Sequence, residues 1–306
     1  MKKDLLRVAD LNREEIQELL DLGQELKAKQ KAGQRVTPLT GKTLGLIFEK
    51  SSTRTRVSFE VGMYQLGGHS LFLSSKDLQL GRGETIPDTA RVLSRYLDGL
   101  VIRTFGHEIV EEMSRHATIP IINGLTDQQH PCQVLADLLT IQEKRQRLHG
   151  LKVSYVGDGN NMANSWLEGA AKLGLHLTLA CPSGYEPDSE TYQEALKEAA
   201  KSDARIEITH DPRKAAEGAD VLYTDVWASM GQEQEHQRRL SAFQGFQLNQ
   251  SLLRLAKPEV LVMHCLPAHR GEEISDEVLD GPHSIVWDQA ENRLHLQKAI
   301  LVKWLG

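Results

Sequence analysis

The chain has 306 residues, of which 40% are hydrophobic and 25% are charged, a composition typical of soluble globular proteins. This length fits two domains of ordinary size better than one. The formal net charge of −6 argues against non-specific binding of nucleic acid, which needs a basic face. No apolar stretch approaches the ~20 residues needed to span a bilayer, and the charged N-terminal segment does not resemble a signal peptide.

The three cysteines, Cys132, Cys181 and Cys265, are widely spaced along the chain. Because they are few and odd in number, a disulfide framework is not expected. This cysteine usage favours a reducing, cytoplasmic location.

The first half of the chain alternates expected strands with expected helices. Apolar residues recur at helical spacing over residues 12–29, where Asn12 is the predicted N-cap and Glu15 completes a capping box. Short apolar runs predict strands, of which the one at residues 43–48 is expected to be buried. These strands cover residues 43–48, 70–73, 99–103 and 120–123, and the predicted helices end at residue 66 and span residues 131–148.

The pattern restarts near Gly150. Strands are expected at 152–156, 176–180, 206–209, 221–224, 260–263 and 284–286, and helices up to residue 173 and at 192–200, 212–217 and 290–304. Strands that alternate with helices predict an α/β fold with two tandem domains, each with a mostly parallel sheet flanked by helices. We expect a first domain at 1–148, a second at 149–287 and a C-terminal helical segment at 288–306 that packs back on the first.

Polar sequences follow several of these strands, and ligands of parallel sheets bind beyond the carboxyl ends of strands. Ser52-Thr53-Arg54-Thr55-Arg56 stands at a helix start directly after strand 43–48. Free backbone N–H groups, the helix dipole, hydroxyls and guanidinium groups favour a bound phosphate there. The alternative is a helix capped by Ser or Thr with solvated arginines. The P-loop pattern is absent.

Two further polar groups follow strands in the first half. Arg103 closes a buried strand, so it needs either a bound anion or an internal salt bridge. His130-Pro131-Cys132-Gln133 opens the helix at 131–148, where His130 and Gln133 could form hydrogen bonds to a carbonyl oxygen and an amide. A single histidine before a helix is more often structural.

The turn Gly157-Asp158-Gly159-Asn160-Asn161 begins like the dinucleotide-binding pattern GxGxxG. Its third glycine is missing, and the next strand ends in Cys181-Pro182 instead of an acidic residue that would bind a ribose. The pattern therefore gives only weak support to a nucleotide-dependent oxidoreductase. Asn160 and Asn161 could face a polar substrate, or the turn could be purely structural.

Two segments of the second half carry candidate catalytic groups. Asp225 follows strand 221–224, where it could bind an ammonium group or cap a helix. Cys265 follows strand 260–263 and could be a buried inert thiol, a metal ligand beside histidines, or a nucleophile. Leu266-Pro267 is a candidate for a cis peptide bond.

The ordered set of these motifs resembles the aspartate/ornithine carbamoyltransferase family over nearly the whole chain, through Glu291-Asn292-Arg293. The segments Asp225 to Gly231 and His264 to Pro267 look like the substrate loops of its ornithine-specific members. The resemblance implies transfer of a carbamoyl group from carbamoyl phosphate to the side-chain amine of ornithine, giving citrulline and phosphate for arginine biosynthesis. It implies no metal or organic cofactor, no nucleic-acid or membrane partner, and a homo-oligomer, either a trimer or a multiple of trimers.

The resemblance also implies roles for individual residues. The implied carbamoyl phosphate-binding residues are Ser52, Thr53, Arg54, Thr55, Gln79, Arg103, His130, Gln133, Cys265, Leu266 and Arg293. The implied ornithine-binding residues are Asn161, Asp225, Ser229 and Met230, and the implied catalytic residues are Cys265, Asp225, Arg103 and His130. The motifs are also compatible with a carbamoyltransferase that acts on a different amine, such as putrescine or an acylated ornithine, and with a non-catalytic protein that kept the fold.

Overall fold

The computed structural model describes residues 3–74, 83–228 and 235–306. The chain forms two compact units: unit 1 is Met1–Leu139 with Glu291–Gly306, and unit 2 is Thr140–Ala290. Each unit contains its own parallel sheet flanked by helices, which confirms the predicted α/β fold. Three residues with predicted roles, Gln79, Ser229 and Met230, lie outside the described residues. Within the described ranges, no helix has the length and apolar character required to cross a membrane.

The sheet of unit 1 has four strands in the order β2-β1-β3-β4. Their bounds are Thr43–Phe48 for β1, His69–Ser74 for β2, Gly99–Arg103 for β3 and Ile121–Leu125 for β4. All pairs are parallel, and Phe48 at the end of β1 lies opposite Arg103 at the end of β3. The strand order reverses between β1 and β3, and ligands of open α/β sheets bind at such a switch point.

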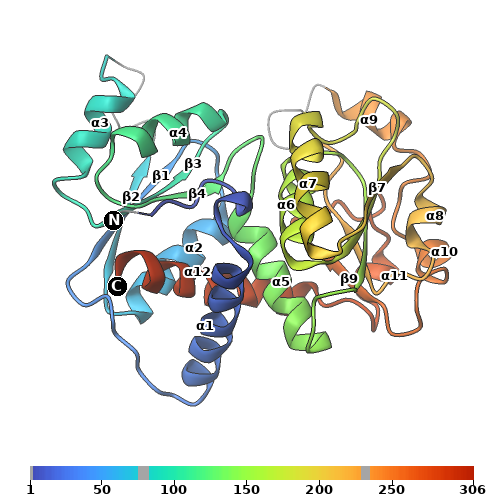
Figure 1. Ribbon diagram of the computed structural model, residues 1–306, viewed down its shortest axis with the longest axis horizontal. Helices are drawn as coiled ribbons and strands as arrows, with labels where there is room; N and C mark the ends of the chain where they lie inside the picture. The colour runs from blue at the N-terminus through green and yellow to red at the C-terminus, as the bar shows by residue number, and fades with distance from the viewer. Residues whose placement is uncertain (1–2, 75–82, 229–234) are drawn as a thin grey trace. The chain divides into compact units, whose positions relative to one another are not determined.

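Helices cover both faces of this sheet, with α3 and α4 on one face and α1, α2 and α12 on the other (Figure 1). The first helix starts as predicted, because Asn12 Oδ1 accepts the Glu15 N–H at 2.8 Å and Glu15 Oε2 accepts the Asn12 N–H at 3.0 Å. The bounds are η1 Val8–Asp10, α1 Arg13–Lys31, α2 Thr53–Gln65, α3 Ile86–Leu93, α4 His107–His116, α5 Pro131–Arg145 and α12 Val286–Leu305.

Polar contacts as well as apolar ones tie α12 to unit 1. The buried Lys298 ammonium donates to Gln30 at 2.8 Å and to Gln65 at 3.0 Å, and its burial lowers the pKa of Lys298. The buried Lys27 donates to Asn292 Oδ1 at 2.7 Å. The side-chain amide oxygens thus accept the hydrogen bonds that the buried ammonium groups would otherwise form with water.

The sheet of unit 2 has five strands in the order β7-β6-β5-β8-β9, all parallel. Their bounds are Lys152–Val156 for β5, His176–Ala180 for β6, Ile206–Thr209 for β7, Val221–Thr224 for β8 and Leu261–His264 for β9. The strand order reverses between β5 and β8, and Thr224 at the end of β8 lies opposite His264 at the end of β9. The switch point therefore carries the turn after Val156 and the residue Asp225.

In unit 2, α6 and α7 lie on one face of the sheet, and α8, α10 and α11 lie on the other (Figure 1). The helix bounds are α6 Asn161–Leu173, α7 Ser189–Ser202, α8 Pro212–Ala216, α9 His236–Ala242, α10 Gln250–Leu253 and α11 Asp276–Leu279. The strand predicted at 284–286 is wrong: Ser284 forms only an isolated bridge with Val262. The chain turns into α12 at Val286 instead, so that helix begins earlier than predicted.

A close approach of two backbone segments explains the glycine in the turn between β5 and α6. A Cβ atom on Gly159 would lie 2.3 Å from the carbonyl carbon of Glu186 and 2.3 Å from the nitrogen of Pro187. The Gly159 N–H donates to the Tyr185 carbonyl at 2.9 Å. The glycine is therefore required by the chain's own backbone, and it carries no evidence for a bound dinucleotide.

We predict that Gly159→Ala lowers the free energy of unfolding by about 1–3 kcal/mol, because the new methyl group meets rigid backbone. The matched control is Gly62→Ala in α2, where the added Cβ would lie 3.3 Å from the flexible Lys298 side chain. There a gain in helix propensity of up to ~1 kcal/mol offsets the crowding. Urea denaturation of both variants gives the comparison, and equal midpoints would contradict the packing argument.

Candidate active site

The start of α2 presents hydroxyl, amide and guanidinium groups beyond the carboxyl end of β1. Ser52 is the N-cap, and its side-chain oxygen accepts the Thr55 N–H at 3.2 Å. Thr53 is exposed in the first turn, and Arg54 is half-buried beside it. Helix N-termini of this kind bind anions because their N–H groups lack partners within the helix.

Arg293 on α12 connects this helix start to α5. Its guanidinium group is almost fully buried and donates to Thr55 Oγ1 at 2.8 Å and to the Gln133 side-chain oxygen. The Gln133 amide nitrogen in turn donates to Asp137 Oδ1 at 2.9 Å. This chain of hydrogen bonds fixes the orientation of the Gln133 amide.

His130 is buried, and the positive charges of three arginines act on its ring. Burial is the main cause that holds the pKa of His130 well below its usual value, and the positive charges of Arg293, Arg103 and Arg54 lower it further. The imidazole is therefore neutral at physiological pH and can donate one hydrogen bond without adding a charge. The arginines provide the positive charge that a phosphate requires.

Sequence reasoning missed Asp137, the buried carboxylate that receives the Gln133 amide. A signal for it was present, because positions four apart lie on the same face of a helix. Sequence reasoning did name Thr55 and Arg293, but the pattern gave no indication that they contact each other.

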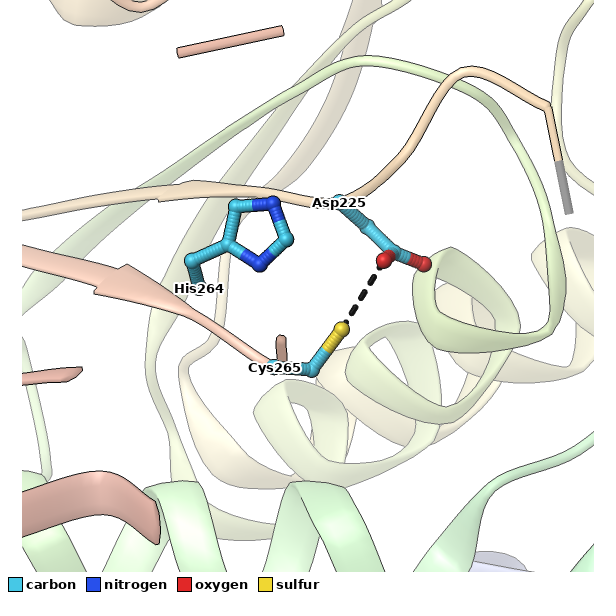
Figure 2. A group of neighbouring side chains, drawn as sticks. All are labelled: Asp225, His264 and Cys265. Carbon is cyan, nitrogen blue, oxygen red and sulfur yellow. Dashed lines mark hydrogen bonds between the residues drawn. The ribbon is translucent and has the colours of Figure 1, made fainter. Parts of the chain in front are cut away.

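In unit 2, Asp225 and Cys265 extend from the ends of the neighbouring strands β8 and β9, and their side chains point toward one another (Figure 2). The Cys265 thiol donates to Asp225 Oδ1 at 2.8 Å. The same oxygen accepts the Val226 N–H at 2.8 Å, and Asp225 Oδ2 accepts the Asn160 amide at 2.8 Å. Both carboxylate oxygens therefore have donors, and the carboxylate is 6% exposed.

The structure brings Asn160 to Asp225, whereas the implied ornithine ligand is its neighbour Asn161. Asn160 is the N-cap of α6, and its side-chain oxygen accepts the Met162 N–H at 2.9 Å and the Tyr155 hydroxyl at 3.1 Å. Asn161 is half-buried at the first position of the helix. Asn160 therefore orients Asp225.

His264 supports the backbone of the cysteine segment. Its Nδ1 accepts the Leu266 N–H at 2.8 Å, so its proton lies on Nε2, which donates to Glu273 Oε1 at 3.0 Å. The Leu266-Pro267 peptide bond, a candidate for the cis form in the sequence, is cis. Leu266 has a φ of 59°, an unusual value for a residue with a branched side chain. The buried pair of His264 and Glu273 holds the residues next to Cys265 in this conformation.

A second buried carboxylate lies near Asp225. Arg239 donates to Asp158 Oδ2 at 2.8 Å and to the Trp227 carbonyl at 2.7 Å. Burial raises the pKa of Asp158 to about 6, against the lowering effect of Arg239, and the charge of Asp225 raises it further. The network thus places two buried carboxylates at the switch point of unit 2, one of them paired with Arg239.

Asp225, His264 and Cys265 lie close enough to be considered as metal ligands. However, both ring nitrogens of His264 already form hydrogen bonds, and the thiol proton is donated to Asp225. The arrangement fits a hydrogen-bonded proton network better than a metal centre. A second group, His269, Glu272 and Glu273, lies in the loop that follows.

Comparisons with known proteins agree with the motifs. A family model described as the carbamoyl-P binding domain of aspartate/ornithine carbamoyltransferase matches residues 3–143, and one described as the Asp/Orn binding domain matches residues 149–304. A protein named ornithine carbamoyltransferase from Anoxybacillus flavithermus is 60% identical over 99% of this chain and 96% of its own length.

Solved structures resemble this chain over nearly their full length. The structure of ornithine carbamoyltransferase from Pyrococcus furiosus is 54% identical, with a TM-score of 0.97, over 100% of this chain and 97% of that one. A Campylobacter jejuni structure described as anabolic ornithine carbamoyltransferase is 42% identical, with a TM-score of 0.93, over 98% and 97% of the two chains. Because the family models match most of the chain, it belongs to the aspartate/ornithine carbamoyltransferase family, as its motifs indicate.

Proposed function

We propose that the chain transfers the carbamoyl group of carbamoyl phosphate to the side-chain amine of L-ornithine, forming L-citrulline and phosphate. The observation that carries the choice of ornithine is the buried carboxylate of Asp225. Among the described residues, no lysine or arginine pairs with it, and a buried carboxylate without a cation favours binding of a substrate ammonium group. Full-length relatives named ornithine carbamoyltransferase support the same choice.

Unit 1 supplies the groups proposed to bind carbamoyl phosphate. The N-terminus of α2, with Ser52, Thr53 and Thr55, would hold the phosphate, and Arg54 and Arg103 would neutralise its charge. The neutral His130 would donate a hydrogen bond to the carbamoyl oxygen, and the Gln133 amide and Arg293 would orient the carbamoyl group.

The proposed reaction begins with attack of the neutral amine nitrogen on the carbamoyl carbon. A C–N bond forms, and the carbonyl oxygen becomes an oxyanion stabilised by His130 and the guanidinium groups. The C–O bond to phosphate then breaks, the carbonyl re-forms and the nitrogen loses a proton. Asp225 and Cys265 are the proposed groups that orient the amine, and the Asp225 carboxylate, to which the thiol donates, is the proposed acceptor of that proton.

We further propose that several copies of the chain assemble, as a trimer or a multiple of trimers. Unit 1 exposes large apolar side chains on the edge strand β2, on α2, and on and just after α3, which a second copy could cover. These residues are Val57, Tyr64, Leu71, Phe72, Val92 and Tyr96.

The remaining assignments are also proposals. Residues 1–148 would bind carbamoyl phosphate, residues 149–287 would bind ornithine, and the segment 288–306 would support the first of these sites through Arg293. A biosynthetic role in the cytoplasm is supported by the free cysteines and by the relative described as anabolic.

The decisive experiment is a carbamoylation assay with ornithine, putrescine and N-acetylornithine at several pH values. We expect ornithine alone to give efficient turnover, because only it offers a free α-ammonium group for Asp225. Activity should rise with pH from neutral into the alkaline range, since an amine with a pKa of about 10 must lose its proton to attack. A preference for putrescine, or no citrulline from ornithine, would refute the proposal.

We predict that substitutions in unit 1 impair the use of carbamoyl phosphate, whereas substitutions in unit 2 impair the use of ornithine. Arg54→Ala should raise the KM for carbamoyl phosphate on the order of a hundredfold, because it removes hydrogen bonds to a charged group. Cys265→Ala should lower turnover and kcat/KM for ornithine while leaving the KM for carbamoyl phosphate nearly unchanged. Steady-state kinetics with each substrate varied in turn measures both effects.

Two matched variants serve as controls. Arg115→Ala removes an exposed arginine of α4 that, among the described residues, donates only to the Glu111 carbonyl of its own helix. Cys181→Ala removes a buried thiol whose pKa burial raises to about 12, so it is inert. Both controls should keep wild-type kinetics. An equal rise in the KM for carbamoyl phosphate in Arg54→Ala and Cys265→Ala would contradict the division.

We also predict that His130 stays neutral from about pH 6 to 8. Its folded-state pKa is lowered by burial first and by the three arginines second, so protonation begins only well below the usual value. NMR of histidine-labelled protein, with His130→Asn used for assignment, should show an unchanging imidazole signal across this range. A titration midpoint near 6.5 would contradict the burial of this ring and the effect of the three positive charges.

A further inference from the structure

The loop that follows the cis-proline gathers three groups able to bind a metal ion. His269, Glu272 and Glu273 each offer one ligand atom, and these atoms lie within 4.8 Å of one another. A neighbour from another element is His236 at the start of α9, whose Nε2 lies 3.2 Å from Glu272 Oε2. His269 Nδ1 lies 3.7 Å from the same oxygen.

Glu273 provides an independent indication of a ligand. The residue is completely buried, and its Oε1 accepts His264 Nε2 at 3.0 Å and the His269 N–H at 2.6 Å. Its Oε2 is also buried, but it accepts no hydrogen bond within the described part of the chain. A buried carboxylate oxygen without a donor is costly, and such atoms call for an unseen partner such as an ion.

The charges around the loop also favour a bound cation. Glu272 and Glu273 place two carboxylates side by side, and like charges at short distance repel each other. The nearby Arg270 does not neutralise them, because its guanidinium group donates to Asp276 at 2.7 Å and to Asp280 at 2.6 and 2.9 Å. The side chains of Glu272, His269 and His236 remain partly exposed, which leaves a path for a solvated cation.

We propose that this loop binds a divalent transition-metal ion of the zinc class, with His269, Glu272 and Glu273 as ligands and with His236 holding Glu272 from outside the group. Imidazole nitrogen and carboxylate oxygen are both zinc ligands, and bond lengths of about 2.0–2.2 Å require the ligand atoms to draw together from separations of up to 4.8 Å. The ion would contact the orphaned oxygen of Glu273. It would thereby stabilise the carboxylate that holds His264, and with it the backbone beside Cys265.

The test is a zinc titration of metal-free, full-length protein against a chromophoric zinc chelator. It is done in a Cys265→Ser background, so that the neighbouring group of Asp225, His264 and Cys265 loses its thiol ligand. We expect one zinc ion per chain, and a melting temperature that rises with zinc. His269→Ala and Glu272→Gln should each weaken binding about tenfold or more and abolish the shift in melting temperature.

The matched control is His210→Ala, which removes another partly exposed histidine located 3.7 Å from a glutamate, Glu186. It should leave zinc affinity unchanged. Cobalt substituted for zinc should give visible absorption bands without a thiolate charge-transfer band in the wild-type chain. The proposal is overturned if Cys265→Ser removes all binding, or if His269→Ala and His210→Ala have equal effects.

Discussion

The buried guanidinium of Arg293 is the interaction on which the arrangement of the proposed phosphate-binding groups of unit 1 depends. It links α12 to α2 through Thr55 and to α5 through Gln133, and its charge contributes to the low pKa of His130. Burying such a charge is costly unless its donors are satisfied and its position is fixed. The contacts of Lys298 and Lys27 provide that fixed position, because they tie α12 to α1 and α2.

In unit 2, the corresponding constraint is the register of two parallel strands. Parallel strands end at the same edge of a sheet, so the pairing of Thr224 with His264 brings the next residues, Asp225 and Cys265, into contact. Asn160, in the turn after β5 at the same switch point, donates a hydrogen bond to Asp225. Unit 1 thus offers positive charge with a neutral imidazole, whereas unit 2 offers carboxylates, which suits one anionic and one cationic substrate.

Local sequence patterns predicted most of the strands and the polar segments that follow them. Apolar runs predicted the strands of both sheets, and polar segments directly after strands predicted the positions of Arg54, Arg103 and Asp225. The strand predicted at 284–286 failed because an apolar run of three residues is equally compatible with the helix that starts at Val286. The sequence analysis did not predict α3, α4, α9, α10 or α11. Of these, α10 and α11 have only four residues each, too few for a helical period to be visible.

The sequence by itself determined what depends on neighbouring residues: the alternation of elements, the Asn12 cap, the helix start at Ser52 and the order of motifs that identifies the family. Only the tertiary structure decided what depends on distant residues. Arg293 and Gln133 are 160 positions apart, and Arg293 and Thr55 are 238 apart. The neutral state of His130 arises from burial and from charges on other elements. The Glu273 oxygen that has no donor among the described residues is likewise a result of burial, and no local pattern encodes either feature.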